Sequence, residues 1–251
     1  MPDIKFRVKR QDPGDNNNPE AHWEEYTVHY EGENLTVLEG LFYIQEKFDG
    51  SLSFRFCCRA SVCGSCAMYI NGAYRLACQT NVKHLDTDLI TVAPMPHLPL
   101  VKDLVVNMDE FFAKYEYVMP WLVRHSPDPE KEIIQSPKER KKIDMPVDCI
   151  LCGSCYSSCP SVWSLGASLG SKSEEYYLGP AALLKAYRFE VDSRDEGGKE
   201  RIARWNNERG IYRCHTIMNC VEACPKELNP TEGIQWLKRA AVRRKLFRKA
   251  K

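Results

Sequence analysis

The chain has 251 residues, 43% of them hydrophobic, which suits two modest domains or one large one with buried cores. Its 35 Lys and Arg against 34 Asp and Glu argue against a protein that holds nucleic acid through phosphate charge. No apolar run approaches the roughly 18 to 20 residues that span a bilayer. The first residues, MPDIKFRVKR, resemble neither a secretory signal nor a transit peptide, so we expect the chain to fold where it is made.

The N-terminal segments alternate apolar and polar side chains. Residues 3–9 and 24–30 have the period of half-buried strands and are predicted to form a hairpin. Thr36, with Glu39 three residues later, is a capping-box pattern. It predicts the start of an amphipathic helix that runs to about Phe48.

A second hairpin is predicted around Asn71 and Gly72, and residues 89–93 (LITVA) supply a further strand. Together these elements predict a small α+β domain over residues 1–105.

The second half, residues 106–251, is predicted to be helical. Asn229 and Glu232 form an N-terminal capping pattern beside Pro230, and Gly210 is a candidate C-cap. The polar, proline-bearing segment 126–146 is interpreted as a surface excursion within this domain. Helical spacing is found in residues 104–118, 181–191, 200–210 and 230–251.

The C-terminal segment 238–251 (KRAAVRRKLFRKAK) is rich in Lys and Arg. Such a basic helix suits anionic lipid or an acidic partner, and a solvated helical face is an equally good interpretation.

Twelve cysteines fall in three groups: five in residues 57–78, four in 149–159 and three in 214–224. In a reducing compartment, disulfides are disfavoured. Clustering of this kind predicts metal or cluster ligation.

The first group has the plant-type [2Fe-2S] spacing, in which four residues, then two, separate the first three cysteines and the fourth follows the hairpin. Small loop residues would let backbone N–H groups point at the cluster sulfurs. The predicted ligands are Cys58, Cys63, Cys66 and Cys78.

Three other interpretations of the first group are less favoured. Cys57 does not fit the spacing and is predicted to be a small packed thiol. A zinc site would usually separate two cysteine pairs by a longer insert. A Rieske centre would need two histidines, and residues 57–66 contain none.

The second group, DCILCGSCYSSCPS, carries the full CxxCxxCxxxCP run of two-cluster ferredoxins. In such runs the first three cysteines hold one cluster and the fourth holds the other. CHTIMNCVEACP fits as the second run if Ile217 takes the second ligand position. The predicted [4Fe-4S] ligands are Cys149, Cys152, Cys155 and Cys224.

The remaining cluster then has three thiolates, from Cys159, Cys214 and Cys220. Because Ile217 cannot bind iron, a [3Fe-4S] cluster of raised potential is predicted, placed last in an electron-transfer line. The alternative is that Ile217 is ordinary core packing and that water or another group completes a cubane.

No dinucleotide fingerprint, P-loop, Ser/His/Asp set or HExxH motif accompanies these clusters. An electron-transfer chain without its own catalytic pocket implies a partner at each end.

The sequence resembles the iron-sulfur subunits of succinate dehydrogenase and fumarate reductase, the respiratory complex II family. The resemblance covers most of the chain and is carried, in order, by SLSFRFCCRASVCGSC, INGAYRLAC, DCILCGSCYSSCPS, GPAALLKAYRFEVDSRD and YRCHTIMNCVEACPKELNPT.

The resemblance implies an α+β fold: a β-grasp plant-type ferredoxin domain followed by an all-helical domain like a bacterial two-cluster ferredoxin. It also implies a flavoprotein partner with covalent FAD, a membrane anchor that contains haem b, and a quinone acceptor, with no nucleic acid. Without a transit peptide, we expect a peripheral position on the cytoplasmic face of a prokaryotic plasma membrane.

The quinone contacts of that family fall on Pro160, Ser161, His215 and Ile217 of this sequence, and we add Trp163 to this vicinity. The family's quinone-linked tryptophan aligns with Ser164, so this chain departs from the pattern there. His215 either assists protonation of the quinone or is a satisfied structural histidine.

We expect the succinate-oxidising direction. The alternatives are a quinol:fumarate reductase, a free multi-cluster carrier and a zinc-stabilised interaction protein. Heterodisulfide-type or glycolate oxidase modules are disfavoured because CCG-type cysteine repeats are absent.

Overall fold

A computed structural model describes residues 3–14, 20–30, 34–127, 129–164 and 177–248 of the chain, with the side chains of 245–248 left out. Backbone contacts divide the chain into two compact units. Unit 1 comprises residues 1–108 with 150–157, and unit 2 comprises 109–149 with 158–251. The domain limits predicted from the sequence, 1–105 and 106–251, remain a prediction.

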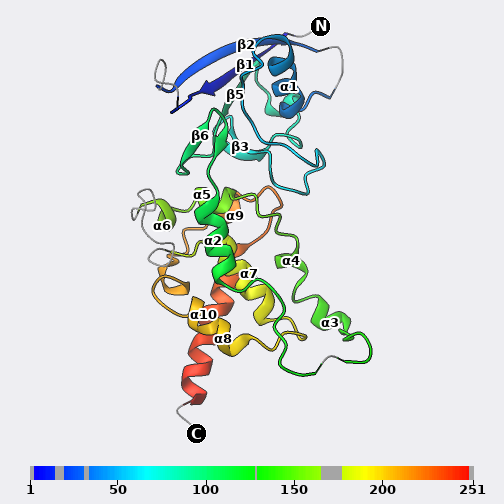
Figure 1. Cartoon of the computed structure of the whole chain (residues 1–251), viewed down its shortest axis with the longest axis vertical. Helices are drawn as coiled ribbons and strands as arrows, with labels where there is room; N and C mark the ends of the chain where they lie inside the picture. The colour runs from blue at the N-terminus through cyan, green and yellow to red at the C-terminus, as the bar shows by residue number, and fades with distance from the viewer. Residues whose placement is uncertain (1–2, 15–19, 31–33, 128, 165–176, 249–251) are drawn as a thin grey trace. The chain divides into compact units, whose positions relative to one another are not determined.

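Unit 1 is built on a five-stranded mixed sheet in the order β2-β1-β5-β3-β4 (Figure 1). The β1–β2 and β3–β4 pairs are antiparallel hairpins, and β5 runs parallel to β1 between them. The sheet and its helix confirm the α+β class predicted for this half. The strands are β1 (Asp3–Arg10), β2 (His22–His29), β3 (Ala67–Ile70), β4 (Ala73–Leu76) and β5 (Leu89–Ala93).

Helix α1 (Val37–Lys47) lies close against the sheet. Its predicted capping box is confirmed: Thr36 accepts from the Glu39 amide, and the Glu39 side chain accepts from the Thr36 amide. A Cβ at Gly40 would lie 2.3 Å from the Phe6 ring, so only glycine permits this close approach. The predicted hairpin turn is also confirmed, with φ of +47° at Asn71 and +75° at Gly72.

The predicted helix over 104–118 begins later than expected. A two-stranded hairpin, β6 (Leu100–Lys102) and β7 (Val105–Val106), comes first, and α2 covers only Asp109–Tyr117. The β-branched pair at 105–106 suits a strand, and its pairing with Leu100–Lys102 prevails over the helical spacing. A short 3-10 helix, η1 (Val82–Leu85), lies within the same unit.

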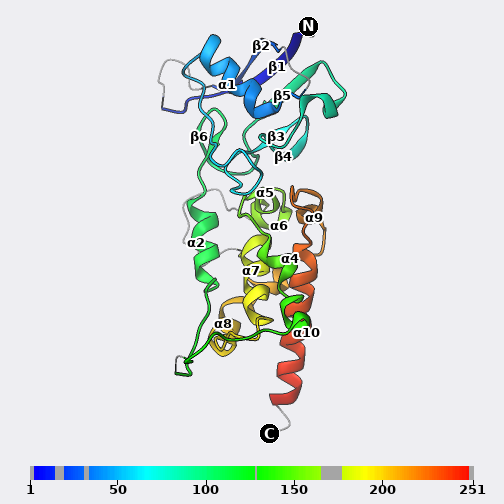
Figure 2. The same cartoon turned by 90° about the vertical axis from the view of Figure 1, so that its right-hand side faces the viewer.

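Unit 2 is helical in its described part, as predicted, with α7 and α10 packed together (Figures 1 and 2). Tyr187 on α7 and Trp236 on α10 hold their ring centroids 5.4 Å apart. The elements are α2, α3 (Pro137–Arg140), α4 (Asp144–Val147), α6 (Pro160–Trp163), α7 (Pro180–Glu190), α8 (Gly198–Trp205), η3 (Ile211–Arg213), α9 (Asn219–Glu222) and α10 (Pro230–Arg248).

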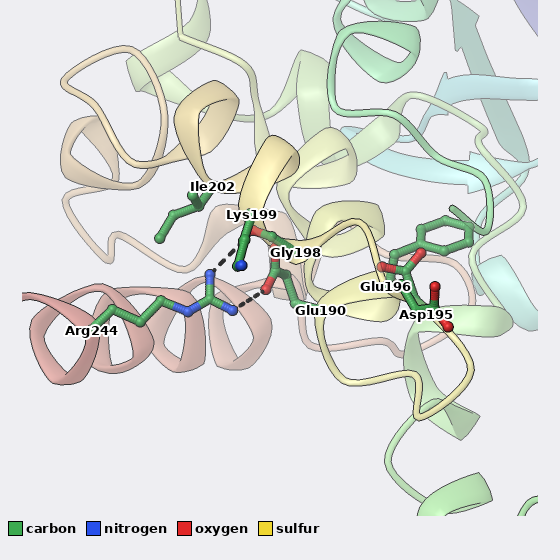
Figure 3. Close-up of a pocket in the computed structure, with 8 residues that line it drawn as sticks. Glu190, Asp195, Glu196, Gly198, Lys199, Ile202 and Arg244 are labelled. Atoms are coloured by element: carbon green, nitrogen blue, oxygen red, sulfur yellow. Dashed lines mark hydrogen bonds and ion pairs between the residues drawn. The ribbon is translucent and has the colours of Figure 1, made fainter. Parts of the chain in front are cut away.

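The ends of α7, α8 and α10 are joined by a buried carboxylate. Figure 3 shows Arg244 of α10 reaching Glu190 of α7, at 2.9 Å, and the backbone at Gly198 of α8. Trp205 donates to the other Glu190 oxygen at 3.2 Å. The Glu190 side chain is 1% exposed, and burial raises its pKa despite Arg244 and Trp205. This contact fixes α10 relative to α7 and α8.

Two capping predictions have different outcomes. Asn229 caps α10 as predicted, because its side chain accepts from the Glu232 amide at 3.0 Å. Gly210 is not the C-cap of α8, which ends at Trp205 with Asn206 as its C-cap. Gly210 is needed for another reason, since a Cβ there would lie 1.9 Å from the Trp205 carbonyl oxygen.

The polar segment 126–146 forms only short helical turns and is largely exposed in its described part, which agrees with a surface excursion. In the described part of the chain, no helix is long and apolar enough to cross a bilayer.

Candidate iron-sulfur centres

The first cysteine group lies in unit 1, in the loop before β3 and just after β4. Cys66 is 4% exposed, Cys63 and Cys78 are half-buried, and Cys58 is exposed. The loop is tightly wound, with φ of +54° at Arg59, +58° at Ser61 and +73° at Gly64. These turns leave one thiol in the core and one at the surface.

Backbone amides of this loop point at sulfur. Those of Ala60, Val62 and Cys63 lie 3.3–3.4 Å from the Cys58 sulfur, and the Cys58 amide lies 3.4 Å from the Cys63 sulfur. Such donors stabilise thiolate and iron-bound sulfur alike. The loop therefore fits an anionic iron-sulfur cluster.

The thiols of this group differ in acidity. Burial works to raise the pKa of Cys63, but hydrogen bonds from the Ser65 hydroxyl and the Cys58 and Ser65 amides lower it to about 6. Burial, with the nearby Cys78 and Cys63 sulfurs, raises the pKa of Cys66 to about 12. Cys66 would ionise only with a cation such as iron beside it.

Gly64 brings the first cysteine loop against the first cysteine run, residues 149–159. A Cβ at this position would lie 2.8 Å from the Ile150 carbonyl oxygen and 2.9 Å from the Cys152 Cα. All three residues belong to unit 1. Two predicted cluster-binding segments are therefore in direct backbone contact.

Cys57 does not behave as predicted, because it is exposed rather than packed. Its neighbours Phe56 and Cys58 are exposed as well.

The second and third cysteine groups share one backbone pattern, displaced by 65 residues. Leu151 and Thr216 have φ of +55° and +60°, and Gly153 and Met218 have φ of +83° and +73°. The carbonyls of Gly153 and Met218 then each accept from the amides three and four residues later. By this register Ile217 stands where Cys152 stands in the first run.

The same register gives short helices of equal length, α5 (Ser154–Ser157) and α9 (Asn219–Glu222). Ile217 therefore occupies a ligand position in backbone geometry, although its side chain cannot bind iron.

The third group surrounds one small cavity in unit 2. Three of the predicted ligands line it together with the residues of the second run that flank Ile217. The lining residues are Cys159, Pro160, Ser161, Tyr177, Pro180, Cys214, His215, Thr216, Ile217, Met218, Asn219, Cys220, Thr231 and Ile234.

Electrostatics in this cavity oppose free thiolates. Burial and the sulfurs of Cys159 and Cys214 raise the pKa of Cys220 to about 11, against a hydrogen bond with Thr231. Burial, with the Cys214 sulfur, raises the pKa of Cys159, and burial with all three sulfurs raises that of Tyr177. Two thiols, Cys159 and Cys220, whose raised pKa values favour ionisation only beside a cation, fit an iron cluster.

Two lysines brace the first cysteine of each run. Lys185 of α7 donates to the Pro146 and Cys149 carbonyls at 3.1 and 3.3 Å. Lys238 of α10 donates to the Cys214 carbonyl at 2.8 Å, so this member of the basic C-terminal segment is used inside the protein. The α7–α10 pair thus supports both cysteine runs.

Four of the predicted quinone-vicinity residues line the cavity: Pro160, Ser161, His215 and Ile217. The fifth, Trp163, is not among its lining residues and is 37% exposed. Ile217 is 52% exposed and His215 is also exposed, so this side of the cavity opens to the surface.

The predicted [4Fe-4S] ligands are divided between the units, with Cys152 and Cys155 in unit 1 and Cys149 and Cys224 in unit 2. Their assignment therefore rests on the sequence spacing. Within the described residues, no group of three or more His, Cys, Asp or Glu side chains is placed to hold a single metal ion.

Sequence reasoning missed Tyr177, Thr231, Lys185 and Lys238, which contact or brace the cysteine runs. No motif spacing marks them, because Lys185, Thr231 and Lys238 reach their cysteines through the packing of α7 or α10, and Tyr177 lies just before α7. For Thr231, its place directly after Pro230 at the start of a predicted helix was the one available signal.

Comparison with known proteins decides the family. Residues 5–113 match the 2Fe-2S iron-sulfur cluster binding domain, and residues 141–225 match the 4Fe-4S dicluster domain. The succinate dehydrogenase iron-sulfur subunit of Paracoccus denitrificans is 42% identical over 96% of this chain and 88% of its own length. The chain belongs to the succinate dehydrogenase iron-sulfur subunit family.

Other members of the family agree with this assignment. A mitochondrial succinate dehydrogenase [ubiquinone] iron-sulfur subunit of Oryza sativa is 44% identical over 93% of this chain and 80% of its own length. That of Candida glabrata is 41% identical over 95% of this chain and 92% of its own length.

The family fold is also recognisable in three dimensions. A chain of the Mycobacterium smegmatis Sdh1 complex in the apo form superposes with a TM-score of 0.82 at 24% identity, over 97% of each chain. The order of the two domains predicted from the sequence, [2Fe-2S] first and two-cluster second, is therefore confirmed.

Proposed function

We propose that this chain is the electron-transfer subunit of a succinate:quinone oxidoreductase, passing electrons from the FAD of a flavoprotein subunit through [2Fe-2S], [4Fe-4S] and [3Fe-4S] clusters to a membrane quinone. The observation that carries the proposal is the repeated backbone of the two cysteine runs, with Ile217 in the ligand position beside the three thiols of one cavity. The catalytic chemistry on succinate belongs to the partner.

The proposed ligand sets follow the spacing of the cysteines. Cys58, Cys63, Cys66 and Cys78 hold the [2Fe-2S] cluster; Cys149, Cys152, Cys155 and Cys224 the [4Fe-4S] cluster; and Cys159, Cys214 and Cys220 the [3Fe-4S] cluster. When bound, these clusters supply one-electron carriers of graded potential.

This chain's own residues supply the setting for that transfer. Amides of the first loop are directed at the Cys58 sulfur, where they favour negative charge. The close approach at Gly64 keeps the first loop beside the Cys152 segment, which gives a short path between two carriers.

The open side of the third cavity is the proposed quinone vicinity. Pro160 and Ile217 are apolar residues that line the cavity with the buried Ser161, and Trp163 is nearby in sequence. His215 is an exposed group able to assist protonation. A mild acceptor belongs at the cluster of highest potential, which the three-thiolate site provides.

The proposed partners are a flavoprotein with FAD and a membrane anchor with haem b. The proposed location is peripheral, at the cytoplasmic face of a prokaryotic plasma membrane. The names of the relatives, succinate dehydrogenases, support the succinate-oxidising direction.

The first test is low-temperature EPR of the air-oxidised, iron-loaded protein. An oxidised [3Fe-4S] centre is paramagnetic, whereas oxidised [2Fe-2S] and low-potential [4Fe-4S] centres are silent. We expect a sharp, nearly isotropic signal approaching one spin per chain. An EPR-silent protein with full iron and sulfide content would refute the [3Fe-4S] assignment. Zinc in place of iron in metal analysis would refute all three clusters. Failure to co-purify with a flavoprotein would favour a free carrier.

The variant I217C tests the ligand position itself. A thiol placed on the backbone geometry of Cys152 is expected to take up a fourth iron, which abolishes the oxidised signal and slows reduction of the quinone. I217A is the matched control, because it removes the isoleucine without adding a ligand and should keep the signal. If I217C keeps the signal at full iron occupancy, the side chain at position 217 does not face the iron position that the three cysteines leave unfilled.

A further inference from the structure

Thr231 makes a buried contact with a predicted ligand of the [3Fe-4S] cluster. Its Oγ1 lies 3.3 Å from the Cys220 Sγ, and the two residues are 5% and 7% exposed. Both line the cavity that also contains Cys159 and Cys214. The hydroxyl is thus held at one sulfur of the site, away from bulk water.

The direction of this hydrogen bond follows from the chemistry of the sulfur. A cysteine that binds iron has lost its proton and can only accept. The hydroxyl can donate, so Thr231 becomes the donor in the loaded protein.

Helix capping does not account for this residue. Asn229 caps α10 by accepting from the Glu232 amide at 3.0 Å. Pro230 occupies the first helical position, where a free amide is absent. The Thr231 hydroxyl is therefore available for the sulfur.

Resting on the proposed function, we propose that Thr231 tunes the [3Fe-4S] centre by donating a hydrogen bond to the Cys220 thiolate. A donor at a ligand sulfur stabilises the reduced cluster more than the oxidised one, because the reduced cluster carries one more negative charge. Thr231 thereby raises the potential of the terminal carrier and favours its reduction. Its role is to tune the site through the ligand, without contact with the quinone.

The test is a redox titration of the oxidised [3Fe-4S] EPR signal in the assembled complex. T231V keeps the side-chain shape and removes the donor, while T231S keeps the donor. We expect T231V to lower the one-electron equilibrium constant for reduction about threefold to tenfold, or about 28 to 59 mV at 59 mV per tenfold change. T231S should stay near the wild-type potential.

T80V is a matched control in unit 1, where the Thr80 hydroxyl is buried and donates to the Leu76 carbonyl at 2.9 Å. It should leave the [3Fe-4S] potential unchanged. An unchanged midpoint in T231V at full cluster content would overturn the proposal, and so would equal shifts in T231V and T231S, which would indicate packing.

If T231V loses the cluster, a second measurement tests the hydrogen bond from Thr231 directly. Pulsed EPR in H₂O and D₂O should detect an exchangeable proton coupled to the oxidised centre in the wild type and T231S, and a weaker coupling in T231A. A coupling retained in full by T231A would overturn the proposal. Absence of the [3Fe-4S] signal from the wild type would instead refute the proposed function, so the two failures are distinguishable.

Discussion

Replacing Gly64 with alanine is expected to disrupt the contact between the first cysteine loop and the first cysteine run, residues 149–159. Gly64 has φ of +73°, and the added Cβ would lie 2.8 Å from the Ile150 carbonyl oxygen and 2.9 Å from the Cys152 Cα. The left-handed conformation costs an alanine about 1 to 2 kcal/mol. The clash is with backbone, which cannot rotate away, so we expect a total loss of about 3 kcal/mol.

Gly72 offers the matched control, because its φ is +75° and an added Cβ would meet nothing within 4 Å. G72A should therefore lose only the conformational part, about 1 to 2 kcal/mol. The assay is urea unfolding of the iron-loaded protein, followed by the visible circular dichroism of the [2Fe-2S] centre and by far-ultraviolet signal. Equal losses in G64A and G72A would refute the inference that the two segments are in backbone contact.

Two further variants test the helices behind the sites. R244M should reduce the free energy of unfolding by about 1 kcal/mol at pH 7.5, since Arg244 is half exposed while Glu190 is buried. Burial already raises the pKa of Glu190. The folded state is therefore progressively destabilised as the pH rises above the pKa of an unfolded glutamate. Loss of Arg244 raises the Glu190 pKa further, so the deficit should shrink toward pH 5, and a deficit independent of pH in urea titrations would contradict this. K185M should speed iron release to a chelator because the Cys149 carbonyl loses its donor, whereas K185R should not, and equal release from both would contradict the bracing role.

Signals confined to a few neighbouring residues were predicted correctly from the sequence. The Thr36–Glu39 capping box and the Asn71–Gly72 turn each involve residues that contact one another directly along the chain. Local energetics therefore fix them before tertiary packing is considered. The Asn229 cap of α10 belongs to the same class.

The wrong predictions concern positions where packing decides the outcome. The strand at Val105–Val106 depends on its partner, Leu100–Lys102, which the helical spacing of the segment concealed. Gly210 looked like a helix cap, but the close approach of the Trp205 carbonyl is what requires it. Exposure of Cys57 depends on how the whole loop folds.

For the candidate site, the sequence predicts the cysteine ligands and the quinone vicinity, and both remain predictions. Cysteine spacing is a covalent property of the chain and follows from cluster geometry. Lys185 and Thr231 reach cysteines 36 and 11 residues away in sequence, through helix packing that no short motif encodes. Residues that contact a cysteine run through helix packing are therefore not identified by cysteine spacing.

The backbone on either side of Ile217 keeps a strained, ligand-binding conformation although the isoleucine side chain cannot bind iron. Thr216 and Met218 both have positive φ, whereas the first run places glycine at the position equivalent to Met218. Each such residue costs about 1 kcal/mol or more, and a β-branched threonine is especially disfavoured there. Two contacts from α10 reach this segment: Gln235 donates to the Thr216 hydroxyl at 2.8 Å, and Lys238 to the Cys214 carbonyl at 2.8 Å. The second run is thus held in the ligand-binding geometry by α10, so the identity of one side chain, and not the shape of the loop, sets how many irons the proposed site can hold.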